Sequence, residues 1–271
     1  MPKPPAFTRY GLSLEELALA LGLVNRPDLG RSLLNSIYPE LSETEAEARL
    51  SAASHSLLAR NLCTISPQGQ PILDSALEKT LFPLIRFDRL YQISVVFGEL
   101  QTNAAVYVRK GNIFTARTVQ AGVAHILDTG SSSLLSDYFS EMFAEASGKT
   151  SLNISAPITP GLLGRALQQV ASRSDCVALL SDAGWLPETA RQLCDDLSHQ
   201  TLRATLLCIE ATETDLEEKL RTSQHRVLML LKGKTRGWGF LFENTLDETI
   251  GQAWQVNARG LNQLFAKFTA A

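Results

Sequence analysis

The sequence lacks the features that most directly indicate a cellular address or a general affinity. Its 271 residues contain no apolar run of about 18 residues, the length that a transmembrane helix needs, so no membrane span is predicted. Charged residues make up 20% of the chain and the formal net charge is −3, which argues against the positive field that drives nonspecific nucleic-acid binding. Residues 1–6 are proline-rich and do not resemble a signal peptide. These absences predict a cytoplasmic protein.

Cysteine motifs are also absent. The four cysteines, Cys63, Cys176, Cys194 and Cys208, match no C-x-x-C spacing and stand in apolar sequence. Free cysteine is among the most buried residue types, so we expect buried free thiols. Cys176 and Cys194 could meet in space, but a cytosolic compartment would keep them reduced.

No catalytic signature is present. The four histidines lie in no H-E-x-x-H motif, and there is no G-x-S-x-G, P-loop or G-x-G-x-x-G pattern. Asp195 and Asp196 are adjacent on a predicted helix, where neighbouring side chains point about 100° apart, so we interpret them as a solvated helix face rather than an acid and base pair. The sequence therefore predicts no enzyme activity, no cofactor and no metal site. A catalytic site assembled from residues far apart in the sequence stays open.

What the sequence does contain is a succession of amphipathic segments. Hydrophobic residues make up 45% of the chain, enough for a substantial core. Capping boxes at residues 13–16 and 42–45 predict the starts of two helices. Residues 62–65 are predicted to be extended, and a third helix is predicted at about 73–85, with Pro83 ending or kinking it.

From residue 91 the hydrophobic period changes to two, which indicates β-strands. Three β-prone runs are followed by a helix that carries paired aromatics: 91–97, 104–108, 113–118 and 134–143. The same order recurs later in the chain: 202–209, 226–231, 238–242 and 261–268. Internal similarity is a strong fold signal, so we interpret the pattern as a duplicated unit. The connection at 109–113 is too short for a parallel crossover, which indicates an antiparallel sheet.

The predicted fold class is therefore α+β, with an antiparallel β-sheet flanked by helical bundles and two quasi-repeated α+β halves. The N-terminal half, residues 1–150, is predicted to contain helices within 13–86, sheet hairpins within 91–118 and a helix at 134–146. The C-terminal half, residues 151–271, is expected to share one continuous core with it.

Two segments of the C-terminal half have specific predictions. Residues 177–180 form an apolar run that is either a short strand or a buried turn. Residues 212–221 are rich in acidic side chains and are interpreted as a solvated helix.

A basic cluster is the clearest candidate for binding. It comprises Arg221, Arg226, Lys232, Lys234 and Arg236, with Trp238 at its edge. Residues 232–237 are predicted to be a hairpin tip that would present three of these charges to a phosphate or an acidic protein. The alternative is a solvated loop whose lysines protect a sheet edge.

The N-terminal helices also permit a winged-helix interpretation, with residues 43–61 as recognition helix and 67–70 as wing tip. Glutamates at the leading end of that helix would repel phosphate, although Arg49 and Arg60 are basic. A structural helix bundle is therefore favoured, and a nucleic-acid-associated regulator is kept as the alternative function.

The layout of nearly the whole chain resembles the EspG-type chaperones of type VII secretion. The resemblance is carried by the segments LSLEELALALGL, EAEARLSAASHSLLARNL and LFPLIRFDRLYQISVVFG, and by the closing order of a hairpin and an amphipathic helix. It implies a cytoplasmic, non-enzymatic binding protein whose partner is a small helical secreted substrate, and which shields the apolar tip of that substrate before export. It also implies that the sheet and its loops bind the substrate.

A surface of this kind should offer apolar area with a polar rim. By position, the rim is expected in the loops at 98–103, 109–112 and 232–238. The candidate partner-binding residues are Lys232, Lys234, Arg236, Trp238, Arg109 and Lys110.

Overall fold

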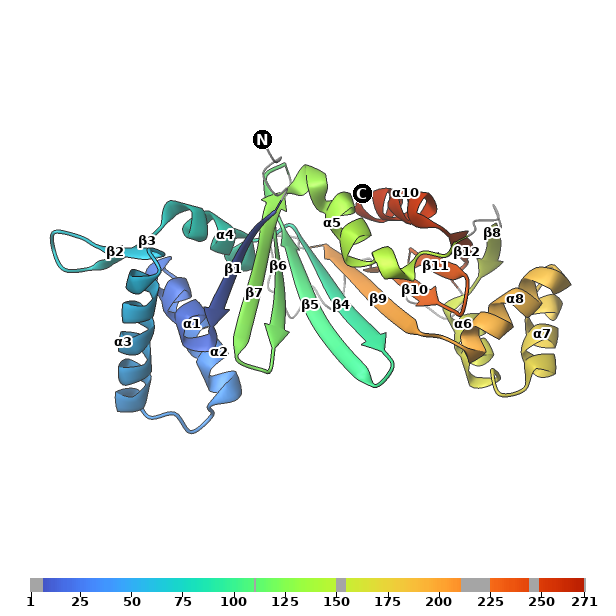
Figure 1. Ribbon diagram of the computed structural model, residues 1–271, viewed down its shortest axis with the longest axis horizontal. Coiled ribbons are helices and arrows are strands. Elements are labelled where there is room, and N and C mark those ends of the chain that lie inside the picture. Colours follow the sequence, from blue (N-terminus) through green and yellow to red (C-terminus); the bar gives the residue numbers. More distant parts are fainter. Residues whose placement is uncertain (1–6, 110, 150–154, 211–224, 244–248, 271) are drawn as a thin grey trace. The chain divides into compact units, whose positions relative to one another are not determined.

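A computed structural model describes residues 7–109, 111–149, 155–210, 225–243 and 249–270. The chain divides into two compact units. Unit 1 comprises Met1–Asp88 and Ala104–Ser132, and unit 2 comprises Arg89–Asn103 and Ser133–Ala271. Both units combine helices with antiparallel strands (Figure 1), so the predicted α+β class is confirmed. Within the described ranges, no helix is long and apolar enough to cross a membrane.

Two helices of unit 1, α1 and α3, begin where their capping boxes predict. The unit opens with these elements: β1 (Thr8–Ser13), α1 (Leu14–Leu23), α2 (Pro27–Ile37), α3 (Glu43–Ala59), β2 (Cys63–Ile65), β3 (Pro71–Leu73) and α4 (Ser75–Ile85). Both capping boxes are present, at the starts of α1 and α3. Pro83 lies inside α4, and the helix ends two residues later at Ile85. Helix α2 was not predicted, although Pro27 occupies its first position, where proline is favoured.

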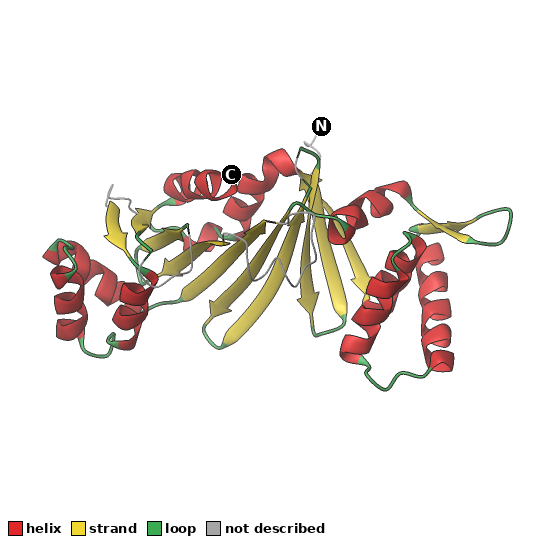
Figure 2. Cartoon of the chain, turned by 180° about the vertical axis from the view of Figure 1, so that it is seen from behind, coloured by secondary structure: helices red, strands yellow, loops and turns green. Residues whose placement is uncertain are grey.

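The strands of unit 1 form an antiparallel sheet. Strand β1 pairs with β7 (Ala124–Ser131), β7 pairs with β6 (Ile113–Gln120), and β6 pairs with β5 (Leu100–Val108). Leucines of β1, α1, α3, α4 and β7 form the core on one side: Leu12, Leu17, Leu21, Leu57, Leu77, Leu81 and Leu127. The β2–β3 hairpin extends away from α3 (Figure 2).

Unit 2 has a wider sheet. Its strand order is β4 (Arg89–Phe97), β9 (Leu202–Glu210), β10 (His225–Lys232), β11 (Gly237–Phe242), β12 (Gly251–Val256) and β8 (Ser155–Ile158), with every paired strand antiparallel. Its helices are α5 (Leu135–Met142), α6 (Pro160–Gln168), α7 (Arg173–Asp182), α8 (Pro187–Ser198) and α10 (Ala258–Thr269). Helices α5 and α10 lie together, and α6, α7 and α8 form a separate group (Figure 1).

The two faces of this sheet pack against different helices. On β11, Trp238 and Phe240 belong to a core cluster that includes α6, α7 and α8. The intervening Gly239 lies against Leu264 of α10, on the opposite face. Aromatic rings of α5, α10 and β4 pack together there, with the Tyr91 ring centroid 5.3 Å from that of Phe139. Alternation along the strands thus fills two separate cores.

Specific predictions were made for two segments of the C-terminal half, residues 177–180 and 212–221. Residues 177–180 lie within α7, so the prediction of a strand or turn is wrong. A short apolar run of four residues cannot be told from a segment of helix by its periodicity alone, and in α7 these residues point in different directions around the helix. Residues 212–221, the predicted solvated helix, lie outside the described residues.

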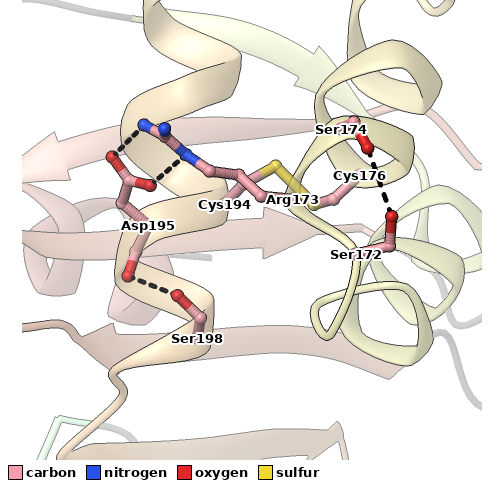
Figure 3. The surroundings of a disulfide bond; sticks show 7 residues. All are labelled: Ser172, Arg173, Ser174, Cys176, Cys194, Asp195 and Ser198. Atoms are coloured by element: carbon pink, nitrogen blue, oxygen red, sulfur yellow. Dashed lines mark hydrogen bonds and ion pairs between the residues drawn. A yellow bond between two sulfur atoms is a disulfide. The ribbon is translucent and has the colours of Figure 1, made fainter.

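Two of the four cysteines are bonded to each other. Cys176 of α7 and Cys194 of α8 form a disulfide with their Cα atoms 6.2 Å apart, and both are buried (Figure 3). The expectation of free thiols is therefore wrong for this pair, because the packing of α7 on α8 brings together two residues that are separate in the sequence. Cys63 and Cys208 are free and buried, as predicted.

The described elements follow one order twice. Apart from the β2–β3 hairpin and the short 3-10 turns, a strand, a group of helices, four strands and a helix run from β1 to α5, and the described elements from β8 to α10 follow the same order. Strands β7 and β12 occupy the equivalent fourth positions, and neither was predicted as a strand. A duplication of the chain stays a prediction.

Candidate partner-binding surface

The β10–β11 hairpin carries four of the six candidate binding residues. Lys234 is exposed at its tip. Lys232 is half-buried and donates a hydrogen bond from Nζ to the backbone oxygen of Ser147, and burial lowers the pKa of its ammonium group. The predicted hairpin tip is therefore present, but its lysines differ in environment.

Asp196 of α8 accepts hydrogen bonds from two more of the candidate binding residues. Its carboxylate Oδ2 accepts a hydrogen bond from Arg236 Nε at 2.7 Å and another from Trp238 Nε1 at 2.9 Å. Asp196 is 2% exposed and Trp238 is 0% exposed. The interpretation of Asp196 as part of a solvated helix face is wrong, whereas Asp195 is exposed and pairs with Arg173 on α7 (Figure 3).

Close backbone packing fixes the base of the same hairpin. A side chain at Gly233 would meet Asp196, and one at Gly237 would meet the backbone of Ala146. The Gly148 N–H donates to the Val256 carbonyl oxygen at 2.8 Å beside them. Arg236 and Trp238 therefore attach the hairpin to the body of unit 2, while Lys234 faces solvent.

The remaining candidates lie elsewhere. Arg109, in unit 1, is partly exposed and pairs with Asp88 at 3.1 Å. Lys110 lies outside the described residues, as does Arg221 of the basic cluster. Arg226 is on β10, with its guanidinium 5.8 Å from the centre of the Phe268 ring.

The turn between β4 and β5 exposes two large apolar side chains that were not among the predicted binding residues. Phe97 ends β4 and is 53% exposed, and Leu100 begins β5 and is 73% exposed. Gly98 between them has a φ of +58°, which a tight turn requires and glycine adopts without strain. The sequence signal was the apolar pair around this glycine, but exposure of the two side chains depends on the folded sheet.

The register of unit 2 brings this turn and the β10–β11 hairpin to one end of the sheet. Phe97 pairs with Leu202, Leu202 pairs with Lys232, and Lys232 pairs with Gly237. Neighbouring strands are about 4.8 Å apart, so the backbones of Phe97 and Lys232 are about 10 Å apart. We name Phe97, Leu100 and Lys234 the sheet-end surface. It joins two of the three predicted rim loops, those at 98–103 and 232–238.

The described residues contain no group of three or more His, Cys, Asp or Glu side chains that could hold a metal ion. The most perturbed histidine is His125 on β7, which is 1% exposed and accepts a hydrogen bond at Nδ1 from Arg117 Nε at 3.1 Å. Burial and the adjacent guanidinium lower the pKa of His125 to about 4. His125 is therefore neutral near pH 7.

The chain was compared with known proteins and structures. No family model matches it, and no curated protein sequence matches it. Among solved structures it is similar to the Mycobacterium tuberculosis type VII secretion system chaperone EspG5, determined in complex with a PE25–PPE41 dimer. The TM-score is 0.65 at 10% sequence identity, over 97% of this chain and 96% of that chain. The chain has an EspG-type fold. The predicted resemblance is thus confirmed for the fold.

Ion pairs within unit 1 involve the two basic residues of the winged-helix alternative. Arg49 of α3 and its C-cap residue Arg60, the basic residues of the winged-helix alternative, pair with Glu15 and Glu16 of α1 at 3.0 and 2.9 Å. Nucleic-acid binding stays an alternative without a specific observation in its favour.

Proposed function

We propose that the protein is a non-enzymatic chaperone or adaptor that binds a helical secretion substrate and shields its apolar tip. The observation that carries the proposal is the similarity of fold to EspG5 along 97% of the chain. EspG5 is a type VII secretion chaperone, and its structure includes a PE25–PPE41 dimer. Because one fold can serve many functions, the proposal also needs a surface of suitable chemistry.

The sheet-end surface has that chemistry. Large apolar side chains are exposed at Phe97 and Leu100, and the cation of Lys234 lies on the neighbouring hairpin tip. Burying an exposed apolar side chain against a partner contributes about 1.5–3 kcal/mol. A charge at the rim contributes more to association rate and to partner choice than to affinity. The expected substrate presents an apolar helical tip with an acidic residue nearby.

The test is copurification followed by matched substitutions. The tagged protein is isolated from its native host at moderate salt, and a small helical secreted protein is expected at stoichiometric yield. With that partner purified, Leu100→Ser should weaken binding at least tenfold and Lys234→Glu should slow association. Leu186→Ser is the control, because Leu186 is also 73% exposed in unit 2 but is the N-cap residue before α8 and lies outside the sheet-end surface.

Two outcomes would count against the proposal. Recovery of the chain without a stoichiometric protein would argue against a stable substrate complex. Equal effects of Leu100→Ser and Leu186→Ser would remove the sheet-end surface as the binding site. Circular dichroism of each variant distinguishes loss of binding from loss of fold.

A further inference from the structure

Unit 1 contains an open groove that is separate from the sheet-end surface. Its volume is about 730 Å³, and its walls are the junction of β1 and α1, one side of α3, and the start of β7. Two ion pairs border it, Arg49 with Glu15 and Arg60 with Glu16. Ala52 of α3 and Val123 also line the groove, and both are exposed.

The two ion pairs are unequal in exposure. The side chain of Arg49 is 42% exposed and that of Glu15 is 19% exposed. The side chain of Arg60 is 41% exposed and that of Glu16 is 6% exposed. In both pairs the arginine side chain is therefore more exposed than that of its glutamate partner. The more accessible charge of each pair is the positive one, although the pairs are neutral overall.

Both guanidinium groups are held in place before any partner binds. Arg49 lies over the Tyr38 ring, 4.3 Å from its centre. Arg60 donates to both oxygens of Glu16 at 2.9 Å, and its Nη2 donates to the Gly11 carbonyl oxygen at 2.7 Å. A planar guanidinium that is already oriented loses less entropy when it binds a carboxylate. Because Arg60 already donates to the Gly11 carbonyl oxygen, that oxygen is not available to accept a hydrogen bond from a partner's β-strand.

We propose that this groove binds an acidic amphipathic helix of a protein partner. Apolar side chains of that helix would cover Ala52 and Val123, and its carboxylates would contact Arg49 and Arg60. Arg49 lies on α3 and Arg60 is its C-cap residue, eleven positions later, which corresponds to about 16 Å along the helix axis and to nearly the same side. A helix that lies along α3 would match them with two acidic residues eleven positions apart. The inference does not depend on the proposed function of the sheet-end surface.

The experiment measures binding of a labelled helical peptide to the full chain by fluorescence anisotropy. The acidic probe carries two glutamates eleven positions apart with leucines between them on the same face, and the control probe carries lysines at the two glutamate positions. We expect the acidic probe to bind, at least tenfold more tightly than the lysine probe, and to weaken as salt increases.

Substitutions at Ala52 locate the binding. Ala52→Trp should obstruct the groove, and Ala52→Glu should repel the acidic probe; each is expected to weaken binding at least tenfold. Ala52 is exposed, so both variants should fold. Ser51→Trp and Ser51→Glu are the matched controls, because Ser51 is exposed on α3 outside the groove lining and should leave binding unchanged.

The proposal is overturned by any of three results. Equal binding of the acidic and lysine probes would show that the groove does not select carboxylates. Equal effects of the Ala52 and Ser51 variants would place the peptide elsewhere. Self-association of the chain that Ala52→Trp abolishes, without peptide binding, would make a second copy the occupant instead.

Discussion

Arg236 should contribute far more to stability than Lys234, although both belong to the same hairpin. Arg236 donates to the buried carboxylate of Asp196 at 2.7 Å, and its own side chain is 24% exposed. Breaking a buried pair by removing one partner typically costs about 3–5 kcal/mol, and partial exposure of Arg236 favours the lower end, about 3 kcal/mol. Lys234→Ala, at an exposed position, should change the free energy of unfolding by less than about 0.5 kcal/mol.

The assay is urea unfolding followed by tryptophan fluorescence. All three tryptophans, Trp185, Trp238 and Trp254, belong to unit 2, so the signal reports the unit that contains the hairpin. Asp196→Asn provides the second edge of a double-mutant cycle, since asparagine keeps an acceptor for the indole N–H but removes the charge. The coupling between Arg236→Ala and Asp196→Asn should be about 1–3 kcal/mol.

Similar unfolding free energies for Arg236→Ala and Lys234→Ala would refute this reasoning, as would a coupling near zero.

The result also bears on the choice of binding variants. Reversing the charges of Lys232, Lys234 and Arg236 together would not isolate their contribution to binding. The Asp196 pair now predicts that this triple variant is destabilised, because it places an acidic side chain against a buried carboxylate. Lys234→Glu alone is the informative substitution.

Further predictions concern pH, backbone packing and redox state. The pKa of His125 is lowered in the folded state, so between pH of about 6.5 and 4 only the unfolded chain gains the proton. The free energy of unfolding should therefore fall as the pH drops through this range. His125→Gln should flatten this slope in urea titrations followed by circular dichroism. Gly237→Ala should lower the free energy of unfolding by about 2 kcal/mol, because its Cβ would meet a backbone carbonyl oxygen. Gly164→Ala, in α6 with open space around it, should instead stabilise the protein by about 0.5–1 kcal/mol. Reducing the bond between Cys176 and Cys194, which closes a loop with a sequence separation of 18, should cost about 3 kcal/mol, measured by denaturation with and without reductant.

Helix starts were the most predictable part of the fold. The capping box of Ser13 and Glu16 places donor and acceptor three residues apart, so its chemistry is visible in a short segment. Strands β1 and β7 were missed for the opposite reason. The register of β1, with Thr8 opposite Thr129, depends on a partner more than a hundred residues away. Strand β7 also pairs with the nearby β6, but each of the two strands alone has weak alternation.

The candidate surface was likewise predictable only in the parts that short-range signals determine. Two loops of the sheet-end surface were predicted from turn signals, and the hairpin at Lys232–Gly237 is where the sequence placed it. The exposure of Phe97 and Leu100 and the burial of Trp238 were not predictable, because burial is decided by which helices cover each face of the sheet.

The sequence by itself determined the α+β class, the antiparallel sheet and the starts of the main helices, because periodicity, caps and turns act over a few residues. Only the tertiary structure decided the bond between Cys176 and Cys194 and the pairing of Arg236 with Asp196, 40 residues away. It also decided that Arg49 and Arg60 are more exposed than the glutamates with which they pair. These contacts join residues that share no local pattern, and their energies come from burial and close approach, which exist only once the elements have packed.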